Sequence, residues 1–381
     1  MNKNKKRISD ILSIVGLLVI IYGFAVAMIL LPDKTFSEEE NRTLQTFPKF
    51  TLEALDNGSY TKKIGTYFAD QIPLRGLFVG TKAACETWLG KHENNNVIIG
   101  RDGHIIAKSD FANYTVMDKN LGAIREFDES NELDLRVAIA PRAQDALLSY
   151  MPELYPAKEI SEREFARVFG GLDGVEQVDL LTPLRLRAKS GEYVYYRTDH
   201  HWTTLGAYYA YVEIIKSYGI EPYPIEYFSR ETVSEEFFGT TWSKAGMRWI
   251  APDSMEFFRF DGDEAFVTEI TDNDTELEGF YDFSYLDKKD KYSAFIGGNN
   301  GRVRISIPQG KVRETLVLVK DSFGHSVAPF LAMHFNLEII DFRYYKQSFS
   351  ELLEQTGADK VLILYNLDSL AASSELLQLN Y

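Results

Sequence analysis

The first feature of the chain is an uninterrupted apolar run from Ile11 to Leu31, which contains no charged residue. Its length is about that of a helix that crosses the hydrocarbon layer of a bilayer. The cationic segment MNKNKKR precedes the run, and three glutamates, Glu38 to Glu40, follow it. By the positive-inside rule, this asymmetry predicts a cytoplasmic N-terminus, a single-pass anchor in the cell membrane and an extracytoplasmic body. The small residues Ala25 to Ala27 also fit a cleaved signal sequence, but the run is longer than most such segments, which favours the anchor.

Beyond the tail and anchor, residues 1–31, the pattern separates a stalk with an N-terminal helical segment, residues 32–95, from a larger domain, residues 96–381. The helical segment has apolar residues at helical spacing that is interrupted at Pro73, which predicts two helices with a break between them. In the stretch NVIIGRDGHIIA, two apolar runs surround Asp102 and Gly103, and this pattern predicts a β-hairpin.

From Leu133 onwards, short apolar runs alternate with helical patterns. The predicted strands are residues 133–141, 174–180, 192–198, 314–320, 337–345 and 360–366, and the predicted helices are residues 142–151, 181–190, 204–219, 322–335 and 348–357. This alternation predicts an α/β fold with a parallel sheet flanked by helices. In such sheets the chemistry lies beyond the carboxyl ends of the strands, where Asp199, His201, Ser322 and Asn366 are expected.

Composition narrows the function classes. The 381 residues are 45% hydrophobic, which is ordinary for a folded protein. A formal net charge of -15 repels nucleic acid phosphates, so we expect no nucleic-acid partner. The single cysteine, Cys85, excludes an internal disulfide and a cysteine-based zinc finger.

The segment YRTDHHWTT, residues 196–204, contains two of the six histidines beside an aspartate. It fits a metal site, part of a catalytic triad, or polar residues without chemistry. In an extended segment, Asp199 and His201 project to one side and His200 to the other. The Asp199 carboxylate is then placed to accept a hydrogen bond from Nδ1 of His201, which leaves Nε2 free to take a proton. Adjacent histidines that diverge seldom bind one ion, and no His-Glu-x-x-His helix is present, so we predict no metal and no cofactor.

A nucleophile for this pair is predicted in LVLVKDSFGHS, where Ser322 follows an apolar strand and begins a helix. Free backbone N–H groups at a helix start favour an oxyanion. Asp321 and Ser322 also fit plain helix-capping residues, which are common at such positions.

These strings resemble the DHHW family of bacterial exported proteins, which is similar to the alginate O-acetyltransferase branch of the SGNH hydrolases. The resemblance rests on TDHHWTTLGAYYAY and KDSFGHSVAPFL and extends through ENRTLQTFP, YFADQIPLR, VAIAPRAQDALLSYMP, FFGTTWSKAG and YSAFIGGNN. It implies a permuted SGNH-like fold in which Ser322, His201 and Asp199 form the catalytic triad. Lys320 departs from the pattern, because the typical motif has a glycine before the Asp-Ser pair.

Five further residues are candidates for the site, each with a structural alternative. Asn366 is predicted as an oxyanion donor, or as an asparagine that ends a strand in a turn. Trp202 fits a platform for a sugar ring, or packing under the following helix. His200 and His325 fit second contacts to substrate, or buried histidines with satisfied hydrogen bonds. Arg142 fits an anchor for an acyl or anionic group, or a solvated residue at a helix start.

A serine activated by a histidine and an aspartate serves acyl transfer. The resemblance implies an O-acetyltransferase or esterase that adds or removes acetyl groups on a cell-surface polysaccharide or wall polymer. It also implies a multi-pass membrane acyltransferase as a partner. The alternative is a non-catalytic, membrane-anchored glycan-binding or scaffold protein that keeps the fold.

Overall fold

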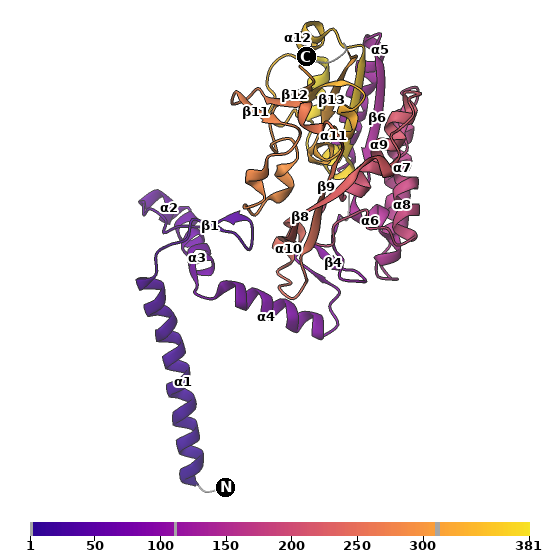
Figure 1. Cartoon of the computed structure of the whole chain (residues 1–381). Helices are drawn as coiled ribbons and strands as arrows, with labels where there is room; N and C mark the ends of the chain where they lie inside the picture. The colour runs from indigo at the N-terminus through magenta and orange to yellow at the C-terminus, as the bar shows by residue number, and fades with distance from the viewer. Residues whose placement is uncertain (1–2, 110–112, 309–312) are drawn as a thin grey trace. The chain divides into compact units, whose positions relative to one another are not determined.

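The computed structural model describes residues 3–109, 113–308 and 313–381, and it divides into two compact units. The first unit comprises residues 1–91 and 246–249, and the second comprises residues 92–245 and 250–381 (Figure 1). The boundary after Lys91 lies close to the one expected after residue 95.

The first unit is mostly helical. Its elements are α1 (Lys3–Leu30), β1 (Phe36–Ser37), β2 (Arg42–Thr43), α2 (Leu52–Asp56), α3 (Ser59–Gln71) and α4 (Arg75–Trp88). The apolar run forms α1, in which Asp10–Leu30 is long and apolar enough to cross a membrane. The predicted break at Pro73 is confirmed, because α3 ends at Gln71 and α4 begins at Arg75. Arg42 ties this unit together through ion pairs with Glu40 and the buried Asp70.

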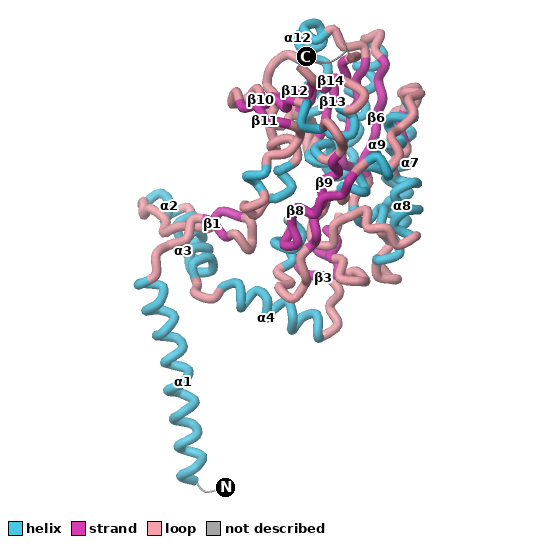
Figure 2. Tube along the Cα trace, viewed as in Figure 1, coloured by secondary structure: helices cyan, strands magenta, loops and turns pink. Residues whose placement is uncertain are grey.

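The second unit is built on an eight-stranded sheet with the order β11-β10-β12-β14-β13-β15-β6-β7 (Figure 2). Its strands are β6 (Asp134–Ala140), β7 (Gln177–Val178), β10 (Val267–Ile270), β11 (Thr275–Glu278), β12 (Arg302–Ser306), β13 (Thr315–Lys320), β14 (Asn336–Ile340) and β15 (Lys360–Asn366). The smaller sheets are β3 (Glu93–Asn94), β4 (Val97–Ile99) and β5 (Ile105–Ala107), and the pair β8 (Ser229–Phe237) and β9 (Asp253–Arg259). The hairpin predicted around Asp102 and Gly103 is confirmed as β4 and β5.

The predicted α/β class is confirmed, but the sheet is mixed. Strands β14, β13, β15, β6 and β7 run parallel to one another, as expected. Strands β12, β10 and β11 extend this sheet in antiparallel fashion. They come from residues 267–306, in which the sequence analysis assigned no strand, because their short, half-polar runs carry little periodicity. Strand β15 is the last in the sequence, yet it lies between β13 and β6.

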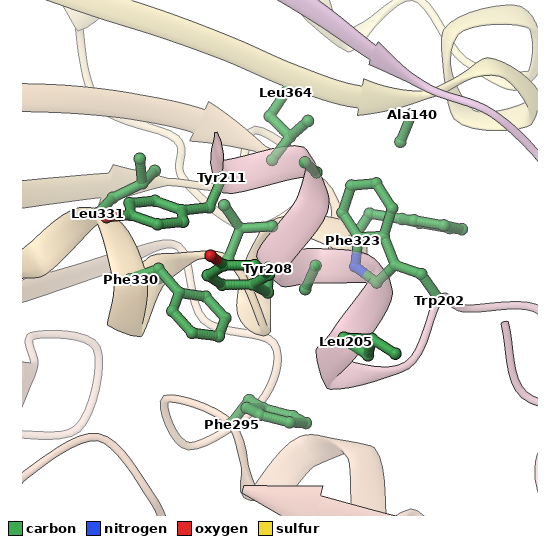
Figure 3. Packing of buried hydrophobic residues seen from close by; sticks show 14 of the residues in the cluster. Ala140, Trp202, Leu205, Tyr208, Tyr211, Phe295, Phe323, Phe330, Leu331 and Leu364 are labelled. Atoms are coloured by element: carbon green, nitrogen blue, oxygen red, sulfur yellow. The ribbon is translucent and has the colours of Figure 1, made fainter. Parts of the chain in front are cut away.

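Both faces of the parallel part of the sheet are buried. The helical elements of this unit are α5 (Tyr114–Ser130), α6 (Ala143–Ala146), α7 (Ala157–Gly171), α8 (Leu181–Lys189), α9 (Thr204–Ser217), α10 (Thr240–Ala245), α11 (Ala328–Ala332), α12 (Phe349–Thr356) and α13 (Leu367–Ala372), with 3₁₀ turns that include η1 (Leu148–Tyr150), η5 (Lys291–Ala294) and η6 (Ser322–His325). Along β13, Leu316 and Leu318 join a core with α9 and α11, whereas Val317 and Val319 join a core with α5, α7, α12 and α13. Figure 3 shows the first core, where Tyr208 and Tyr211 of α9 pack against Phe330 and Leu331 of α11.

One predicted strand is absent. Residues 192–198 form a loop in which only Tyr195 pairs, by an isolated bridge to Trp202. Tyr195 and Tyr196 are buried in the core, and this burial explains why the segment reads as an apolar strand. The helix predicted over 322–335 is instead the turn η6 followed by the short α11. Thr203 caps the start of α9, because its hydroxyl accepts a hydrogen bond from the Gly206 N–H.

Candidate active site

Ser322 lies directly after β13, near the middle of the large sheet. Asp321 shapes this turn, since its carboxylate accepts a hydrogen bond from the Phe323 N–H at 2.9 Å. Its second oxygen accepts the backbone N–H of Asn366 at 2.8 Å, at the end of the neighbouring strand β15. Asp321 is buried, and burial raises the pKa of its carboxyl group. The predicted capping role of Asp321 is therefore present, and it holds the serine turn against the sheet.

Asp199 lies in the loop between α8 and α9, and the preceding residue fixes this loop. The Asp253 carboxylate accepts hydrogen bonds from the Thr198 backbone N–H and hydroxyl at 2.8 and 2.5 Å. The Thr198 carbonyl accepts a hydrogen bond from the backbone N–H of Trp242 at 2.9 Å. Because Asp253 and Trp242 come from distant segments, the aspartate loop is held by tertiary contacts rather than by a strand.

The structure brings Asp199, His201 and Ser322 into one hydrogen-bonded chain. Asp199 Oδ1 lies 2.6 Å from His201 Nδ1, and it also accepts the His201 backbone N–H at 3.0 Å. Nε2 of His201 lies 2.7 Å from Oγ of Ser322. With the Nδ1 proton donated to the carboxylate, Nε2 presents its lone pair to the serine hydroxyl. This is the arrangement of a general base oriented by an acid.

The protonation states suit this arrangement. Burial, aided by the neighbouring His200, lowers the pKa of His201 to about 4 despite the opposing effect of Asp199. His201 is therefore neutral at physiological pH and able to accept a proton. Burial alone raises the pKa of Asp199, but the two histidines and several hydrogen bonds hold it well below its usual range. Asp199 is therefore a carboxylate.

Two residues that the sequence analysis did not assign to the site hold the other side of Asp199. Its Oδ2 atom accepts hydrogen bonds from the backbone N–H and the hydroxyl of Thr240, at 2.7 and 2.9 Å. Gly239 approaches so closely that a Cβ atom there would lie 2.3 Å from the Asp199 Cβ. The segment FFGTTW carried the resemblance, but nothing in its own pattern indicates contact with Asp199.

Tyr292 is a third residue that was missed. Its ring stacks on His201 with a centroid separation of 3.9 Å and an interplanar angle of 8°. The hydroxyl of Tyr292 lies 2.9 Å from Oγ of Ser326, which also accepts the indole N–H of Trp202 at 2.9 Å. The imidazole is thus fixed both in its plane and along its hydrogen-bonding axis.

The orientation predicted for His200 is wrong. The rings of His200 and His201 lie with centroids 3.7 Å apart, because Asp199 caps a tight turn and the segment is not extended. Nδ1 of His200 lies 2.7 Å from the Thr240 hydroxyl, and 41% of its side chain is exposed. His200 therefore borders the opening of the site.

Asp199, His200 and His201 are the group in the described part of the chain whose ligand atoms lie close enough together to hold a metal ion. Both nitrogens of His201 are already engaged, one with Asp199 and one with Ser322. A metal ion bound through His201 would displace one of these hydrogen bonds. The donor set therefore fits proton transfer better than metal binding.

Trp202 packs in the core rather than forming a sugar platform. It is fully buried, and its ring meets Phe323 edge-on with centroids 5.0 Å apart (Figure 3). The alternative of packing beneath the helix holds. Trp202 contributes by connecting the loop of Asp199 to the turn of Ser322, since Phe323 follows the serine directly.

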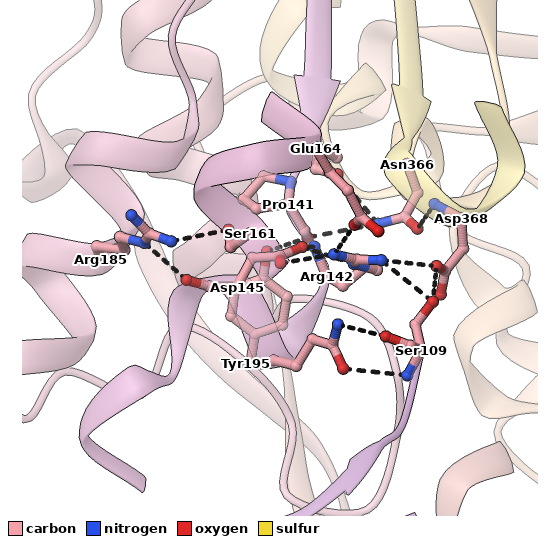
Figure 4. Close-up of polar contacts among 12 residues, drawn as sticks. Ser109, Pro141, Arg142, Asp145, Ser161, Glu164, Arg185, Tyr195, Asn366 and Asp368 are labelled. Carbon is pink, nitrogen blue, oxygen red and sulfur yellow. Dashed lines mark hydrogen bonds and ion pairs between the residues drawn. The ribbon is translucent and has the colours of Figure 1, made fainter. Parts of the chain in front are cut away.

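Asn366 and Arg142 make structural contacts (Figure 4). Nδ2 of Asn366 donates to the carbonyls of Ala140 and Pro141 at 3.1 and 3.3 Å, and its Oδ1 caps α13. Its amide is thus occupied, against the prediction of an oxyanion donor. Arg142 is buried and paired with Asp145 at 2.7 Å and with Glu164 at 2.6 Å, so it is not a free anchor for a substrate.

His325 points into a buried charged cluster behind the serine turn. Its Nε2 lies 2.8 Å from Nζ of Lys320, and the same ammonium lies 3.2 Å from Asp341. Lys320 is only 1% exposed, and burial lowers its pKa. The predicted substrate contact of His325 is therefore not present. Gly324 lets the serine turn pass close to the Lys320 side chain, because a Cβ at this position would lie 2.7 Å from the Lys320 Cβ.

Comparison with known proteins confirms the resemblance stated from the sequence. Residues 181–340, which include Asp199, His201 and Ser322, match the family model described as DHHW protein. Residues 110–240 match the model described as the SGNH hydrolase-like domain of the acetyltransferase AlgX.

Curated relatives include two proteins called probable alginate O-acetylase AlgJ. The one from Pseudomonas fluorescens is 28% identical over 188 residues, covering 46% of this chain and 47% of that protein. The one from Azotobacter vinelandii is 27% identical over 160 residues, covering 40% and 41%. The chain therefore spans about half the length of the curated relatives it matches.

Solved structures share the fold. A DHHW family protein from Eubacterium siraeum superposes with a TM-score of 0.63 at 24% identity, covering 76% of this chain and 96% of that one. PatB1 from Bacillus cereus, solved with a sulfonyl adduct, gives a TM-score of 0.60 at 16% identity, covering 73% and 96%. These likenesses confirm the predicted α/β fold.

Proposed function

We propose that this chain, which resembles the DHHW family, is an O-acetyltransferase or esterase that works through Ser322, His201 and Asp199. The observation that carries the proposal is the 2.7 Å contact between His201 Nε2 and Ser322 Oγ, with Asp199 on the far side of the imidazole. A neutral, buried imidazole in that position removes the hydroxyl proton as the oxygen attacks a carbonyl carbon.

The reaction has two steps. Ser322 Oγ forms a bond to the carbonyl carbon of an acetyl ester while His201 takes its proton. The bond between that carbon and the leaving oxygen then breaks, and His201 returns the proton to the leaving group. In the second step, water or a sugar hydroxyl gives its proton to His201 while its oxygen bonds to the carbonyl carbon of the acetyl-serine. The bond between that carbon and Ser322 Oγ then breaks, and His201 returns the proton to Ser322, which releases acetate or the acetylated sugar. Water gives hydrolysis, and a sugar hydroxyl gives transfer.

Stabilisation of the oxyanion is assigned to main-chain donors at the serine turn. The Ser322 N–H belongs to the first residue of η6, the same residue that carries the proposed nucleophile. Asn366 supports this turn indirectly, through its backbone bond to Asp321.

The acceptor is proposed to be a cell-surface polysaccharide or wall polymer. Support comes from the relatives called probable alginate O-acetylases and from the apolar helix Asp10–Leu30, which fits a single-pass anchor. With the N-terminus in the cytoplasm, the body is extracytoplasmic. An acetyl donor must then be delivered across the membrane, so a multi-pass acyltransferase is the proposed partner.

The test is hydrolysis of p-nitrophenyl acetate by the full chain in detergent. Ser322→Ala is expected to reduce the rate to the background, whereas the exposed Ser190→Ala, at the end of α8, retains it. A sulfonyl fluoride is expected to add its mass to the peptide that contains Ser322, and not in the Ser322→Ala variant. Equal rates and no labelling would support a non-catalytic scaffold instead.

Transferase and esterase are separated by the acceptor. With p-nitrophenyl acetate as the donor, a transferase forms acetylated polysaccharide and releases correspondingly less free acetate. Release of acetate from a polysaccharide that already carries acetyl esters identifies an esterase.

A further inference from the structure

Helix α4 carries an apolar face whose large side chains are mostly exposed to solvent. Leu74, Leu77, Phe78, Cys85 and Trp88 recur at helical spacing and are all exposed. We call these five residues the α4 stripe. Leu77 is 62% exposed and Trp88 is 85% exposed. A run of large apolar side chains open to water indicates a binding surface.

The opposite side of α4 is ordinary for a folded protein. Ala83 is buried, and a Cβ atom at Gly80 would touch the side chain of Arg248 in the same unit. Lys82 and Glu86 form an i,i+4 ion pair outside the stripe. The helix is thus held in place by its small residues, while its large apolar residues are presented outwards.

The α4 stripe is continuous with the apolar helix α1. The ring of Phe78 meets that of Phe24 with centroids 5.7 Å apart. Phe24 lies six residues before the end of α1 at Leu30, which is about 9 Å along the helix axis. If α1 crosses a bilayer, Phe24 lies within the hydrocarbon layer, and Phe78 must reach the same depth.

An apolar groove lies beside this contact, with a volume of about 860 Å³. Ile21 and Met28 of α1 line one side, and Phe47, Phe68 and Ile72 line the other. All of these residues belong to the first unit. Acyl chains fit such a groove, because its lining residues are aliphatic or aromatic apart from Asp33.

Charge also favours a lipid partner. The chain as a whole has a net charge of -15, but residues 59–91 contain five basic and two acidic side chains, a net charge of +3. Lys62, Lys63 and Lys82 are exposed. Basic residues beside an apolar helical face are typical of helices that lie in the surface of an anionic membrane.

We infer that the α4 stripe lies in the outer leaflet of the bilayer, so that α4 is an interfacial helix beside the membrane-spanning α1. This inference rests on the membrane anchor of the proposed function, and it adds a second, lipid-binding contact. Trp88 then takes the place of an aromatic anchor at the level of the headgroups.

The experiment uses the full chain in nanodiscs that hold one copy each and contain anionic phospholipid. Cys85 is the single cysteine and lies in the stripe, so it accepts a polarity-sensitive fluorophore without any other change. In a Cys85→Ser background, the label is moved to Lys82→Cys on the same helix, to Leu77→Cys in the stripe and to Val15→Cys within α1. Quenching by brominated lipid and by aqueous iodide is compared at each position.

Brominated lipid is expected to quench the labels at Cys85 and Leu77→Cys several-fold more than the label at Lys82→Cys. Aqueous iodide is expected to quench the label at Lys82→Cys more than the other two. Equal iodide quenching at all three positions on α4 would overturn the inference. The label at Val15→Cys decides the anchor separately. If it is quenched by lipid while Cys85 is quenched by iodide, the anchor stands and the interfacial helix does not. If iodide reaches Val15→Cys, the anchor fails as well.

Discussion

Gly239 offers a test of how tightly Asp199, the proposed catalytic acid, must be held. In Gly239→Ala, the new Cβ would lie 2.3 Å from the Asp199 Cβ and 2.4 Å from its Oδ2. Ordinary van der Waals contact begins at 3.4 Å, so the two segments must separate by about 1 Å. The neighbouring Thr240 donates two hydrogen bonds to Asp199, so the shift stretches these bonds and moves His201 away from Ser322.

A displacement of about 1 Å of a catalytic group can cost ~100-fold in rate. We therefore expect kcat/KM for p-nitrophenyl acetate to fall about 100-fold in Gly239→Ala. Overpacking of the site is expected to lower the free energy of unfolding by about 1–3 kcal/mol, so circular dichroism must show that the variant is folded at the assay temperature.

Two controls accompany the measurement. Gly122→Ala places a methyl group in open space on α5, and it should leave kcat/KM unchanged while raising the unfolding temperature. Thr240→Ser keeps the hydroxyl that bonds to Asp199 and should stay near full activity, whereas Thr240→Ala should lose activity. A folded Gly239→Ala with full activity would refute the idea that the position of Asp199 limits the reaction.

Four further predictions concern the buried site and its surroundings. Because burial lowers the pKa of His201 to about 4, kcat/KM should rise with pH through an acid limb near that value, and a limb near 6.5 would contradict the assigned base. The unfolded chain binds this proton near pH 6.5, so the same histidine should make urea denaturation easier as pH falls from 6.5 towards 4. Lys320→Ala should lower the free energy of unfolding by about 2–4 kcal/mol in urea denaturation, because it leaves the buried Asp341 with one cation fewer, and a neutral result would show that the pair is not needed. Asn366→Ala should lower the unfolding temperature through the lost cap of α13 but reduce kcat per folded molecule less than tenfold, whereas a loss as large as that of Ser322→Ala would restore Asn366 as an oxyanion donor.

The sequence predicts those parts of the fold that have a strong local signal. The continuous apolar runs of β13 and β15 were sufficient to predict these two strands. The break at Pro73 and the Asp-Gly turn likewise placed the neighbouring elements correctly. The strand predicted at 192–198 was wrong because buried tyrosines in a loop give the same apolar pattern as a strand. The antiparallel strands β10 to β12 were missed because half-polar edge strands have no distinct period.

The candidate site also divides into residues that have a local sequence signal and residues that have none. Asp199, His201 and Ser322 were found because two adjacent histidines and a serine after an apolar strand are visible in the sequence. Gly239, Thr240 and Tyr292 were not, since their roles exist only after distant loops meet. The wrong orientation of His200 came from assuming an extended segment where Asp199 bends the chain with its own side chain.

The position of β15 has a consequence for biosynthesis. This strand is synthesised after both of its neighbours, yet it joins β13 to β6 and carries the backbone N–H that binds the Asp321 carboxylate. A nascent chain that stops before Lys360 would leave two half-sheets without their shared neighbour. The turn of Ser322 would then remain unassembled until β15 has been synthesised, so termination before that strand should leave the proposed site incomplete and without activity.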